Sequence, residues 1–330
     1  MHAAPIAMTM GDPAGIGPEL LLRAWLARDA IAAPFFALAD PDALAELARR
    51  LALAVPIAVV DPAEALGAFE HALPVAPLAN AAGARAGQPH SDFAAATVES
   101  IERAVGYVRS GAAQAVVTNP ISKKTLYEAG FAHPGHTEFL GELAKSWGEA
   151  AQPVMMIWSP LLAVVPVTIH IPLAVVPAEL TRPLIVSTAR IVDRDMQKRF
   201  GIARPRLALT GLNPHAGEGG AMGSEEIETI APAIAELLAE GLDVVGPLPA
   251  DTMFHPAART RYDVALTMYH DQGLIPAKTL AFDDGVNVTL GLPFVRTSPD
   301  HGTAFDIAGK GLANPSSLIA ATRLAARLSG

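Results

Sequence analysis

Cysteine is absent from this sequence of 330 residues. Its absence excludes disulfide bonds, thiolate nucleophiles, iron–sulfur clusters and cysteine-ligated zinc. Any transition metal must therefore be held by histidine and carboxylate side chains. The chain offers 10 histidines for such a role.

Charge is also sparse, and basic residues are in the minority. Charged residues make up 17% of the chain, with 24 basic against 33 acidic side chains and a formal net charge of −9. No basic run and no basic patch interleaved with aromatic residues stands out. Because polyanions bind positively charged surfaces, we expect neither nucleic acid nor an anionic membrane as the main partner.

Long uninterrupted hydrophobic runs are missing too. The most hydrophobic segment, residues 154–176, is broken by Pro160, Pro166, His170 and Pro172. Such breaks are typical of buried strands and argue against a membrane helix. The N-terminal residues show no positively charged segment ahead of an apolar one, so no targeting signal is expected. The sequence thus predicts a soluble, cytoplasmic protein without a membrane partner.

The pattern along the chain predicts an α/β fold of roughly two domains. Short apolar runs alternate with longer amphipathic ones, which implies a largely parallel sheet with helices on both faces. The expected strands cover residues 6–10, 35–39, 115–118, 154–158, 161–169, 207–210 and 264–269. The expected helices cover residues 42–53, 91–109, 180–200, 224–240 and 316–328, with a further one beginning near Pro18.

Three histidines follow the ends of expected strands, namely His170, His215 and His270. Sites in open α/β sheets gather at the carboxyl ends of strands. Three neutral imidazoles can hold one divalent ion and leave a coordination position open for substrate. The competing interpretation is three separate polar loop histidines, because no short metal-binding signature is present.

Two aspartates, Asp251 and Asp271, are candidate catalytic residues. A carboxylate next to a metal-binding histidine can orient its ring, and a free carboxylate can act as a base. A helix cap or a turn carboxylate is the competing interpretation, especially for Asp251.

The first expected strand leads into a glycine-containing loop, residues 11–19, which opens a helix. Its backbone N–H groups could face an anion, so Gly11 and Asp12 are candidate cofactor-binding residues. The glycine spacing matches neither a Rossmann dinucleotide turn nor a phosphate-binding P-loop. A plain tight turn explains the loop equally well.

A second glycine-rich loop, residues 301–315, precedes the last expected helix. Glycines allow the backbone to approach a ligand closely. His301 could stack on or bond to a base, and Asp306 could accept from a ribose hydroxyl. The candidate cofactor-binding residues in this loop are His301, Gly302, Thr303, Asp306 and Asn314.

The few cations and their neighbours suggest an anion site. Lys278, Asn287 and Arg296 follow His270 in the sequence, whereas His136 and Thr137 stand in a short glycine-containing motif. Such side chains converging on one cleft would suit a phosphate or a carboxylate. Taken singly, each is more often a solvated surface group.

Seven blocks of sequence, in order along nearly the whole chain, resemble the 4-hydroxythreonine-4-phosphate dehydrogenase family of vitamin B6 biosynthesis. The late loop is also similar to the adenine-side loop of isopropylmalate and isocitrate dehydrogenases, although Phe305 replaces their proline. The seven blocks are residues 10–19, 135–139, 168–173, 211–220, 249–252, 269–273 and 291–298.

The resemblance implies a two-domain α/β/α isocitrate/isopropylmalate dehydrogenase-like fold, with a mostly parallel sheet and a cleft between the domains. Residues 1–128 and 273–330 would form the terminal, cofactor-binding domain. Residues 129–272 would form the middle domain for metal binding and dimerisation. The family is homodimeric with an active site shared between subunits, and the residue matching His170 comes from the partner chain.

The resemblance also implies an activity. NAD or NADP would oxidise C3 of 4-phosphooxy-L-threonine, and the oxo acid would decarboxylate to 3-amino-2-oxopropyl phosphate. A divalent metal (Zn²⁺, Co²⁺ or Mg²⁺) would act as a Lewis acid. The implied metal ligands are His170, His215 and His270. The implied substrate contacts are His136, Thr137, Lys278, Asn287 and Arg296.

Other activities stay open at this point. The nearest alternative is a related dehydrogenase for D-threonate or D-erythronate 4-phosphate. A more remote one is a phosphate acyltransferase of the same superfamily, which would need neither metal nor nicotinamide. A non-catalytic binder of a phosphorylated ligand is the last alternative.

Overall fold

The computed structural model describes residues 4–31, 33–80, 85–133, 135–145, 147–148 and 151–330. The chain divides into two compact units. Unit 1 comprises Met1–Pro153 and Leu292–Gly330, and unit 2 comprises Val154–Gly291. The boundaries expected from the sequence, after residues 128 and 272, make a different division and stay a prediction.

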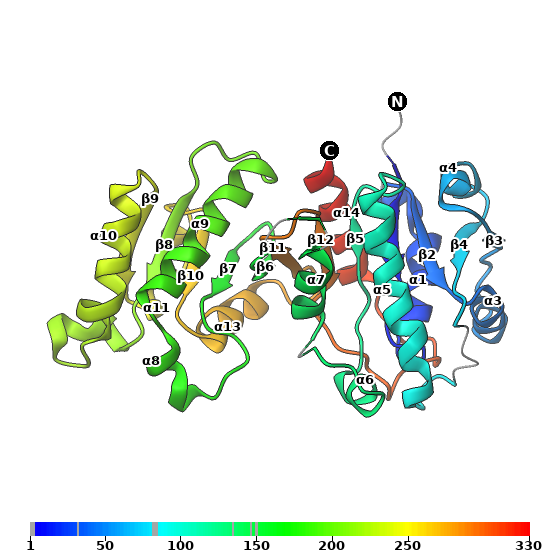
Figure 1. The fold of residues 1–330 in the computed structure, drawn as a ribbon, viewed down its shortest axis with the longest axis horizontal. Helices are drawn as coiled ribbons and strands as arrows, with labels where there is room; N and C mark the ends of the chain where they lie inside the picture. The colour runs from blue at the N-terminus through cyan, green and yellow to red at the C-terminus, as the bar shows by residue number, and fades with distance from the viewer. Residues whose placement is uncertain (1–3, 32, 81–84, 134, 146, 149–150) are drawn as a thin grey trace. The chain divides into compact units, whose positions relative to one another are not determined.

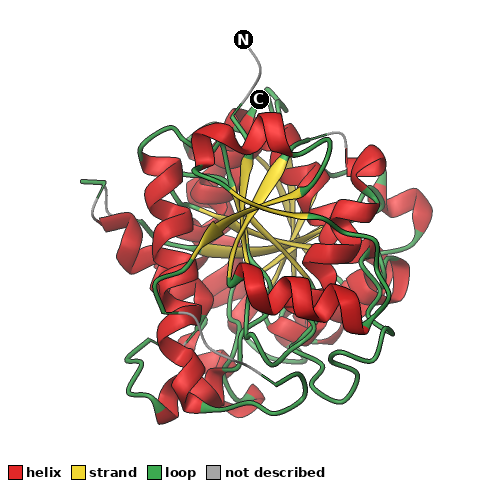
Figure 2. Cartoon of the chain, turned by 90° about the vertical axis from the view of Figure 1, so that its right-hand side faces the viewer, coloured by secondary structure: helices red, strands yellow, loops and turns green. Residues whose placement is uncertain are grey.

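Unit 1 is a parallel sheet with helices on both of its faces (Figures 1 and 2). Its strands are β1 Ile6–Thr9, β2 Phe35–Ala39, β3 Ile57–Val59, β4 Leu73–Pro77, β5 Val116–Val117 and β12 Arg296–Pro299. Its helices are α1 Gly17–Leu26, α2 Arg28–Ile31, α3 Pro41–Arg50, η1 Pro62–Glu64, α4 Ala65–Ala68, η2 Ser91–Phe93, α5 Ala94–Arg109, α6 Lys123–Glu128, α7 His136–Lys145 and α14 Ser316–Ser329.

The strands of unit 1 lie in the order β3-β4-β2-β1-β5-β12, and these neighbours pair in parallel. The strands β1 and β2 are buried along their whole length, because α5 and α14 both contact the central strands. Burial on two faces explains their continuous apolar sequences. Since parallel strands end at one edge, the loops after β1, β2, β4, β5 and β12 lie at a common edge.

Unit 2 has a mixed sheet and helices of its own. Its strands are β6 Val154–Trp158, β7 Ala163–Pro166, β8 Arg206–Thr210, β9 Asp243–Leu248, β10 Val264–Thr267 and β11 Val286–Leu290. Its helices are η3 Leu173–Val175, α8 Val176–Glu179, α9 Arg182–Lys198, η4 Pro214–Gly220, η5 Glu226–Ile230, α10 Ala231–Ala239, α11 Ala250–Met253, α12 Pro256–Arg259 and α13 His270–Leu280.

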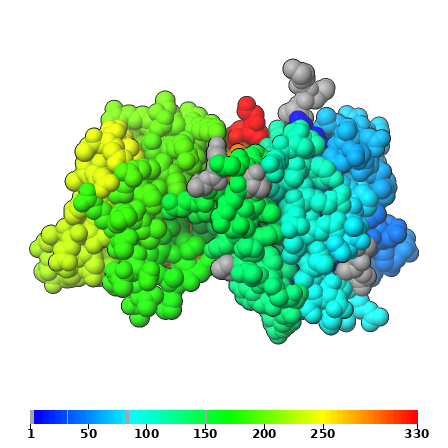
Figure 3. All heavy atoms as spheres, in the orientation of Figure 1, coloured from blue at the N-terminus to red at the C-terminus, as the bar shows by residue number. Residues whose placement is uncertain are grey.

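The strands of unit 2 lie in the order β11-β6-β7-β10-β8-β9. Strands β7, β10, β8 and β9 are parallel, whereas β6 runs antiparallel to β7 and β11. Figure 3 shows one face of the molecule with all heavy atoms, coloured along the chain. The expected α/β class with a mostly parallel sheet is therefore confirmed.

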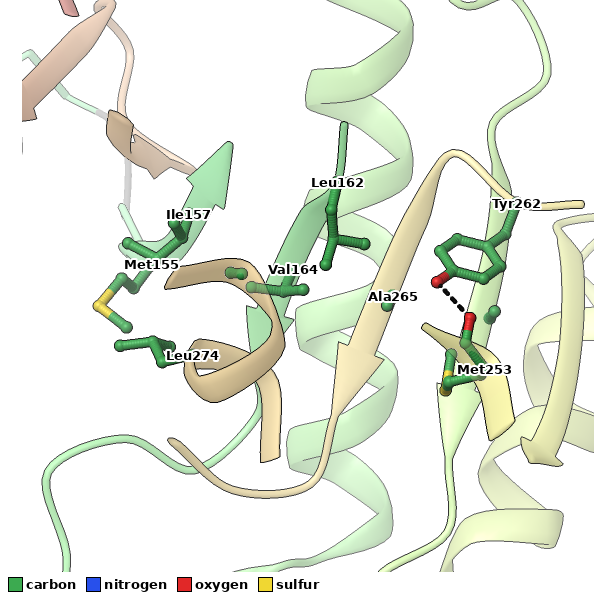
Figure 4. Packing of buried hydrophobic residues seen from close by; sticks show 10 residues of the cluster. Met155, Ile157, Leu162, Val164, Met253, Tyr262, Ala265 and Leu274 are labelled. Atoms are coloured by element: carbon green, nitrogen blue, oxygen red, sulfur yellow. Dashed lines mark hydrogen bonds between the residues drawn. The ribbon is translucent and has the colours of Figure 1, made fainter. Parts of the chain in front are cut away.

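A cluster of buried side chains joins the sheet of unit 2 to α11 and α13 (Figure 4). Its polar member, Tyr262, donates a hydrogen bond of 2.8 Å from its hydroxyl to the carbonyl of Met253, so no polar atom of this side chain is left without a partner there. The cluster comprises Met155, Ile157, Leu162, Val164, Ala208, Met253, Tyr262, Ala265, Leu274 and Ala277.

Most elements expected from periodicity are confirmed, with shifted ends. Strand β3 was not expected because it has only three residues. Strands β4, β9, β11 and β12 and helices α7 and α13 were not expected, because their sequences carry proline, glycine or several polar residues. The stretch 211–223, expected as a loop, contains the turn η4. Among the described residues, no helix is long and apolar enough to cross a membrane.

The neighbours Leu161 and Leu162 offer a matched test of the core of unit 2. Leu162 is 5% exposed and Leu161 is 52% exposed. We expect Leu162→Ala to lower the free energy of unfolding by about 2–5 kcal/mol, because the change removes buried area and leaves a cavity. Leu161→Ala should cost less than about 1 kcal/mol. Urea unfolding of both variants checks this, and equal losses would contradict the packing.

Candidate active site

Four neighbouring parallel strands of unit 2 end at the candidate metal and acid–base residues. His170 follows β7, His270 follows β10, His215 follows β8 and Asp251 follows β9. Because parallel strands end at the same edge, the fold carries all four residues to that edge. The expected placement of the three histidines at strand ends is confirmed.

Two of these histidines lie next to each other. The ring centroids of His170 and His270 are 5.5 Å apart. Both line a cavity of about 290 Å³ in unit 2, together with Tyr269 and Asp271. The remaining lining is largely apolar and comes from Ile169, Ile171, Leu173 and Val176.

Carboxylates fix the orientation of two candidate ligands. Nδ1 of His270 lies 2.7 Å from Oδ1 of Asp271, and Nδ1 of His215 lies 3.0 Å from Oε2 of Glu218. An ionised carboxylate can only accept, so Nδ1 must carry the proton in both rings. A neutral ring then keeps its lone pair on Nε2, which is the arrangement of a metal-binding histidine.

The described part of the chain contains no group of three or more histidine, aspartate or glutamate side chains close enough to hold a metal. His215 stands in the turn η4, and its side chain is 62% exposed. The three histidines still suit a divalent metal, because His170 and His270 lie side by side. The Nδ1 atoms of His270 and His215 also each face a carboxylate, which leaves Nε2 for a metal. The three-histidine site stays a prediction.

Unit 1 holds a buried cation. Arg296, the first residue of β12, is 3% exposed and donates from Nε and Nη2 to Oγ1 of Thr118, at 3.1 and 2.6 Å. Burial lowers the pKa of Arg296 to about 10, because desolvation disfavours the charged form. The group is still charged at neutral pH, and a buried guanidinium binds phosphate and carboxylate strongly.

The start of α7 adds polar groups beside this cation. His136 is its first residue, and the free N–H groups of a helical first turn favour anions. A Cβ built on Gly135 would lie 3.3 Å from Nζ of Lys123, so this ammonium adjoins the same turn. Burial, and then the charges of Arg296 and Lys123, hold the pKa of His136 well below its usual value. His136 is therefore neutral at pH 7.

Several candidate ligand contacts carry a buried polar atom without a partner. Among the described residues these atoms include Nε2 of His136, Oδ1 of Asn287 and Nε2 of His301. A buried unpartnered polar atom costs about 1–3 kcal/mol. Three of the residues expected to contact substrate or cofactor therefore have an unused hydrogen-bonding atom, which a ligand can satisfy.

The remaining expected substrate contacts are Thr137 and Lys278, both half-buried. Thr137 lies in the first turn of α7, within unit 1. Lys278 lies in the last turn of α13, within unit 2. The expected acid–base residues Asp251 and Asp271 are both exposed, each in the first turn of a helix.

Packing explains the first glycine loop. Gly11 has a φ of +73°, and a Cβ there would lie 2.5 Å from the carbonyl oxygen of Pro120. Asp12 is 2% exposed and accepts from the backbone N–H of Ala14 at 2.9 Å. Burial raises the pKa of Asp12. In this structure both residues shape the turn, and their expected cofactor contacts stay a prediction.

A buried carboxylate anchors the late loop. Glu19 on α1 is fully buried, and its carboxylate accepts from the backbone N–H groups of Gly311 and Ala313. Asn314 accepts from the N–H of Ser316 at 3.0 Å, at the start of α14. The backbone carbonyl of Thr303 accepts from Ile16 at 3.0 Å, which joins this loop to the first one.

Among the expected cofactor residues of the late loop, Gly302, Asp306 and Asn314 are exposed and accessible to a ligand. His301 is half-buried, and its Nδ1 lies 3.0 Å from the carbonyl oxygen of Gly302. The structure therefore places five of the expected cofactor residues in one loop of unit 1, at the edge where β12 ends.

A cavity of about 260 Å³ lies within unit 1, at the carboxyl ends of β1, β2 and β4. Its wall is mostly apolar, with polar groups from Asp40, Glu46, Arg50 and Asn80. Gly15 of the first loop and Gly309 of the late loop also line it. Small-molecule sites are typically apolar hollows with a few polar groups of this kind.

Sequence reasoning assigned no ligand-binding role to Asn119 and did not foresee the contact of Glu19 with the late loop. Asn119 is 1% exposed and its Oδ1 has no partner within the described residues. The position of Asn119 after β5 was an available signal, because polar residues at strand ends mark sites. The contact of Glu19 with residue 311 had no local signal, since the two are far apart in sequence.

Comparison with known proteins identifies the family. A family model described as pyridoxal phosphate biosynthetic protein PdxA matches residues 30–325, and the chain belongs to this family. A relative from Methylorubrum extorquens, named 4-hydroxythreonine-4-phosphate dehydrogenase, is 62% identical over 328 residues, which cover 98% of this chain and 94% of the relative. The resemblance expected from the sequence motifs is confirmed.

Two further proteins bear the same name. A relative from Bradyrhizobium diazoefficiens is 58% identical over 337 residues, covering 99% of this chain and 98% of the relative. A crystal structure of the enzyme from Klebsiella pneumoniae has a TM-score of 0.87 and 36% identity, and covers 99% of this chain and 100% of the other. The fold is therefore that of this dehydrogenase family.

The neutral state of His136 predicts a pH dependence of stability. Its pKa is lowered in the folded protein, so below about pH 6.5 the unfolded chain takes up a proton that the folded chain does not. The free energy of unfolding should fall as the pH drops, by up to about 1.4 kcal/mol per pH unit from this group. His136→Gln should lose less stability than wild type between pH 7.5 and 5.5 in urea unfolding.

The exposed His71 supplies the control for this measurement. His71→Gln should keep the wild-type pH dependence, because the side chain of His71 is exposed in the folded protein. A His136→Gln variant that loses as much stability as wild type would show that His136 takes up a proton in the folded state.

Proposed function

We propose that this protein is an oxidoreductase that converts 4-phosphooxy-L-threonine to 2-amino-3-oxo-4-phosphooxybutanoate with NAD or NADP. The β-oxo acid then loses CO₂ and yields 3-amino-2-oxopropyl phosphate, a step toward vitamin B6. The proposal is supported by membership of the PdxA family and by the names of the relatives.

The observation in the molecule that carries the proposal is the set of polar groups prepared for a ligand. Arg296 is a buried cation, and His136 and Asn287 each keep a buried atom without a partner. These are residues that the family resemblance assigns to substrate binding. The anionic oxygens of a phosphorylated amino acid would accept from Arg296, whereas Oδ1 of Asn287 would accept from a donor such as its ammonium group.

His170, His215 and His270 would hold the divalent metal, which when bound supplies Lewis acidity at a substrate oxygen. Histidine nitrogen donors favour Zn²⁺ or Co²⁺ over Mg²⁺. The nicotinamide, when bound, accepts the hydride. The late loop (His301, Gly302, Thr303, Asp306 and Asn314) and the first loop (Gly11 and Asp12) would hold the dinucleotide, and the 260 Å³ cavity beside them suits its adenine.

The protein's own side chains would position the substrate and move its proton. Arg296, Lys278 and the first turn of α7, with His136 and Thr137, would bind the anionic groups. A carboxylate would accept the C3 hydroxyl proton, and the choice lies between Asp251 and Asp271. Because Asp271 already lies 2.7 Å from Nδ1 of His270, its role is to orient that ring, and Asp251 is the better base.

A homodimer in the cytoplasm is part of this proposal, with the active site shared between subunits. The exposed apolar side chains Ile171 and Leu173, which follow His170, are suitable contacts for a second copy. The D-threonate or D-erythronate 4-phosphate alternative is not favoured by the names of the relatives. The phosphate acyltransferase alternative also lacks support, because it gives the histidines no role.

A steady-state assay tests the activity. We expect NADH or NADPH to form with 4-phosphooxy-L-threonine. The kcat of this reaction should fall at least about 100-fold after chelation of the metal and should recover when Zn²⁺ or Co²⁺ is added. D-threonate 4-phosphate should be turned over with a much lower kcat/KM.

The variant Arg296→Lys shows whether the turnover measured in that assay comes from this protein or from a contaminating enzyme. Lysine keeps the charge but loses the planar fork, so kcat/KM should fall about 10–100-fold. Undiminished turnover after full metal removal would contradict the metal-dependent mechanism, and turnover unaffected by Arg296→Lys would point to a contaminant.

Mixing two inactive variants tests the shared site. His170→Ala and His270→Ala should each be inactive as homodimers. A mixed dimer has one intact site if His170 reaches the partner's site, so random reassortment should restore about a quarter of the wild-type activity. If the mixture stays inactive although mixed dimers form, each subunit uses its own His170.

A further inference from the structure

The turn that carries His215 has an unusual backbone. Five successive residues of η4 are left-handed, with φ of 53° at His215, 52° at Ala216, 78° at Gly217, 45° at Glu218 and 65° at Gly219. Three of the five have a side chain. The left-handed conformation disfavours residues with a Cβ, which normally visit it singly. The turn is therefore strained by its own sequence, and contacts from elsewhere must hold it.

One carboxylate makes several of the contacts at the entry to the turn. Glu226, the first residue of η5, is 4% exposed. Its Oε1 accepts from the backbone N–H groups of Leu212 and Asn213, both at 2.7 Å, and its Oε2 accepts from Nδ2 of Asn213 at 3.0 Å. Burial raises the pKa of Glu226, but hydrogen bonds, chiefly from Asn213, outweigh it and hold the pKa below its usual value.

Two glycines make room for this carboxylate. A Cβ on Gly217 would lie 2.5 Å from Oε2 of Glu226, and a Cβ on Gly211 would lie 3.0 Å from Oε1. The carboxylate thus fills the inside of the turn, close to its backbone on both sides. Glu226 both anchors the entry to the turn and supports its middle.

A second side chain fixes the base of the turn to the strand end before His270. Gln272 donates from Nε2 to the carbonyl of Gly211 at 2.8 Å. Its Oε1 accepts from Oγ1 of Thr210 at 2.7 Å and from the backbone N–H of Met268 at 2.8 Å. Gln272 therefore joins the ends of β8 and β10, which carry His215 and His270.

We propose that Glu226 is a positioning residue: its buried carboxylate holds residues 211–220 in the left-handed turn and so fixes the place of His215 as a metal ligand. This inference rests on the proposed function, which gives His215 that role. The contact of Glu218 with Nδ1 of His215 depends on the same turn, so loss of the turn also releases the ring.

Titration of the metal-free protein with Co²⁺, followed by visible absorption, tests the inference. We expect Glu226→Gln to weaken Co²⁺ affinity about 10–100-fold. The amide keeps the shape, but its NH₂ group would face the Nδ2 donor of Asn213. The absorption of bound Co²⁺ should also change, because the ligand geometry changes. Glu228→Gln on the same helix is the control, since Glu228 is exposed and should bind Co²⁺ as wild type does.

A rescue separates positioning from general stability. Adding Ala216→Gly to Glu226→Gln removes a Cβ from a left-handed residue and should recover Co²⁺ affinity at least about threefold. If Glu226→Gln does not fold, Gly217→Ala replaces it, because its Cβ would push the carboxylate away from the turn. The same loss of affinity is expected for that variant.

The outcomes distinguish the inference from the proposed function. Wild-type Co²⁺ affinity in folded Glu226→Gln or Gly217→Ala, with binding abolished in His215→Ala, overturns the inference alone. A loss in Glu226→Gln that Ala216→Gly does not relieve also overturns it. Unchanged Co²⁺ binding in His215→Ala, or none in wild type, overturns both the inference and the proposed metal site.

Discussion

Parallel pairing of β7, β10, β8 and β9 is the constraint on which the candidate chemistry of unit 2 depends. It places the residues that follow these strands at one edge, although they are distant in sequence. His170 and His270 adjoin because β7 and β10 are neighbours. One added residue in a strand would change which side chain follows its end, so the pairing register is part of the site.

In unit 1 the candidate site depends on polar groups that folding buries. Folding removes Arg296 from water and leaves atoms of His136 and His301 without partners among the described residues, and each such group costs stability. A core optimised for stability alone would replace these groups with apolar ones. The proposed function accounts for their presence, because a bound ligand would restore the missing interactions and gain affinity from a preformed site.

The sequence predicted the elements with the strongest periodicity. Buried apolar strands such as β1 and β2 were found, because both of their faces are covered. The strand β12, with sequence Arg-Thr-Ser-Pro, was not found, since only its position beside β5 makes it a strand. The anchoring of the late loop by Glu19 was also missed, because that contact joins distant parts of the chain.

The turn at His215 shows the limit of local reasoning most clearly. Asp271 and Glu218 orient the rings of His270 and His215 from one and three residues away, and sequence proximity can suggest such contacts. The left-handed backbone cannot be inferred in this way, because histidine, alanine and glutamate all oppose it. We infer that the carboxylate of Glu226, which accepts from two backbone N–H groups just before the turn, helps to stabilise this conformation. A place where the local preference is overruled is where a functional constraint is expected.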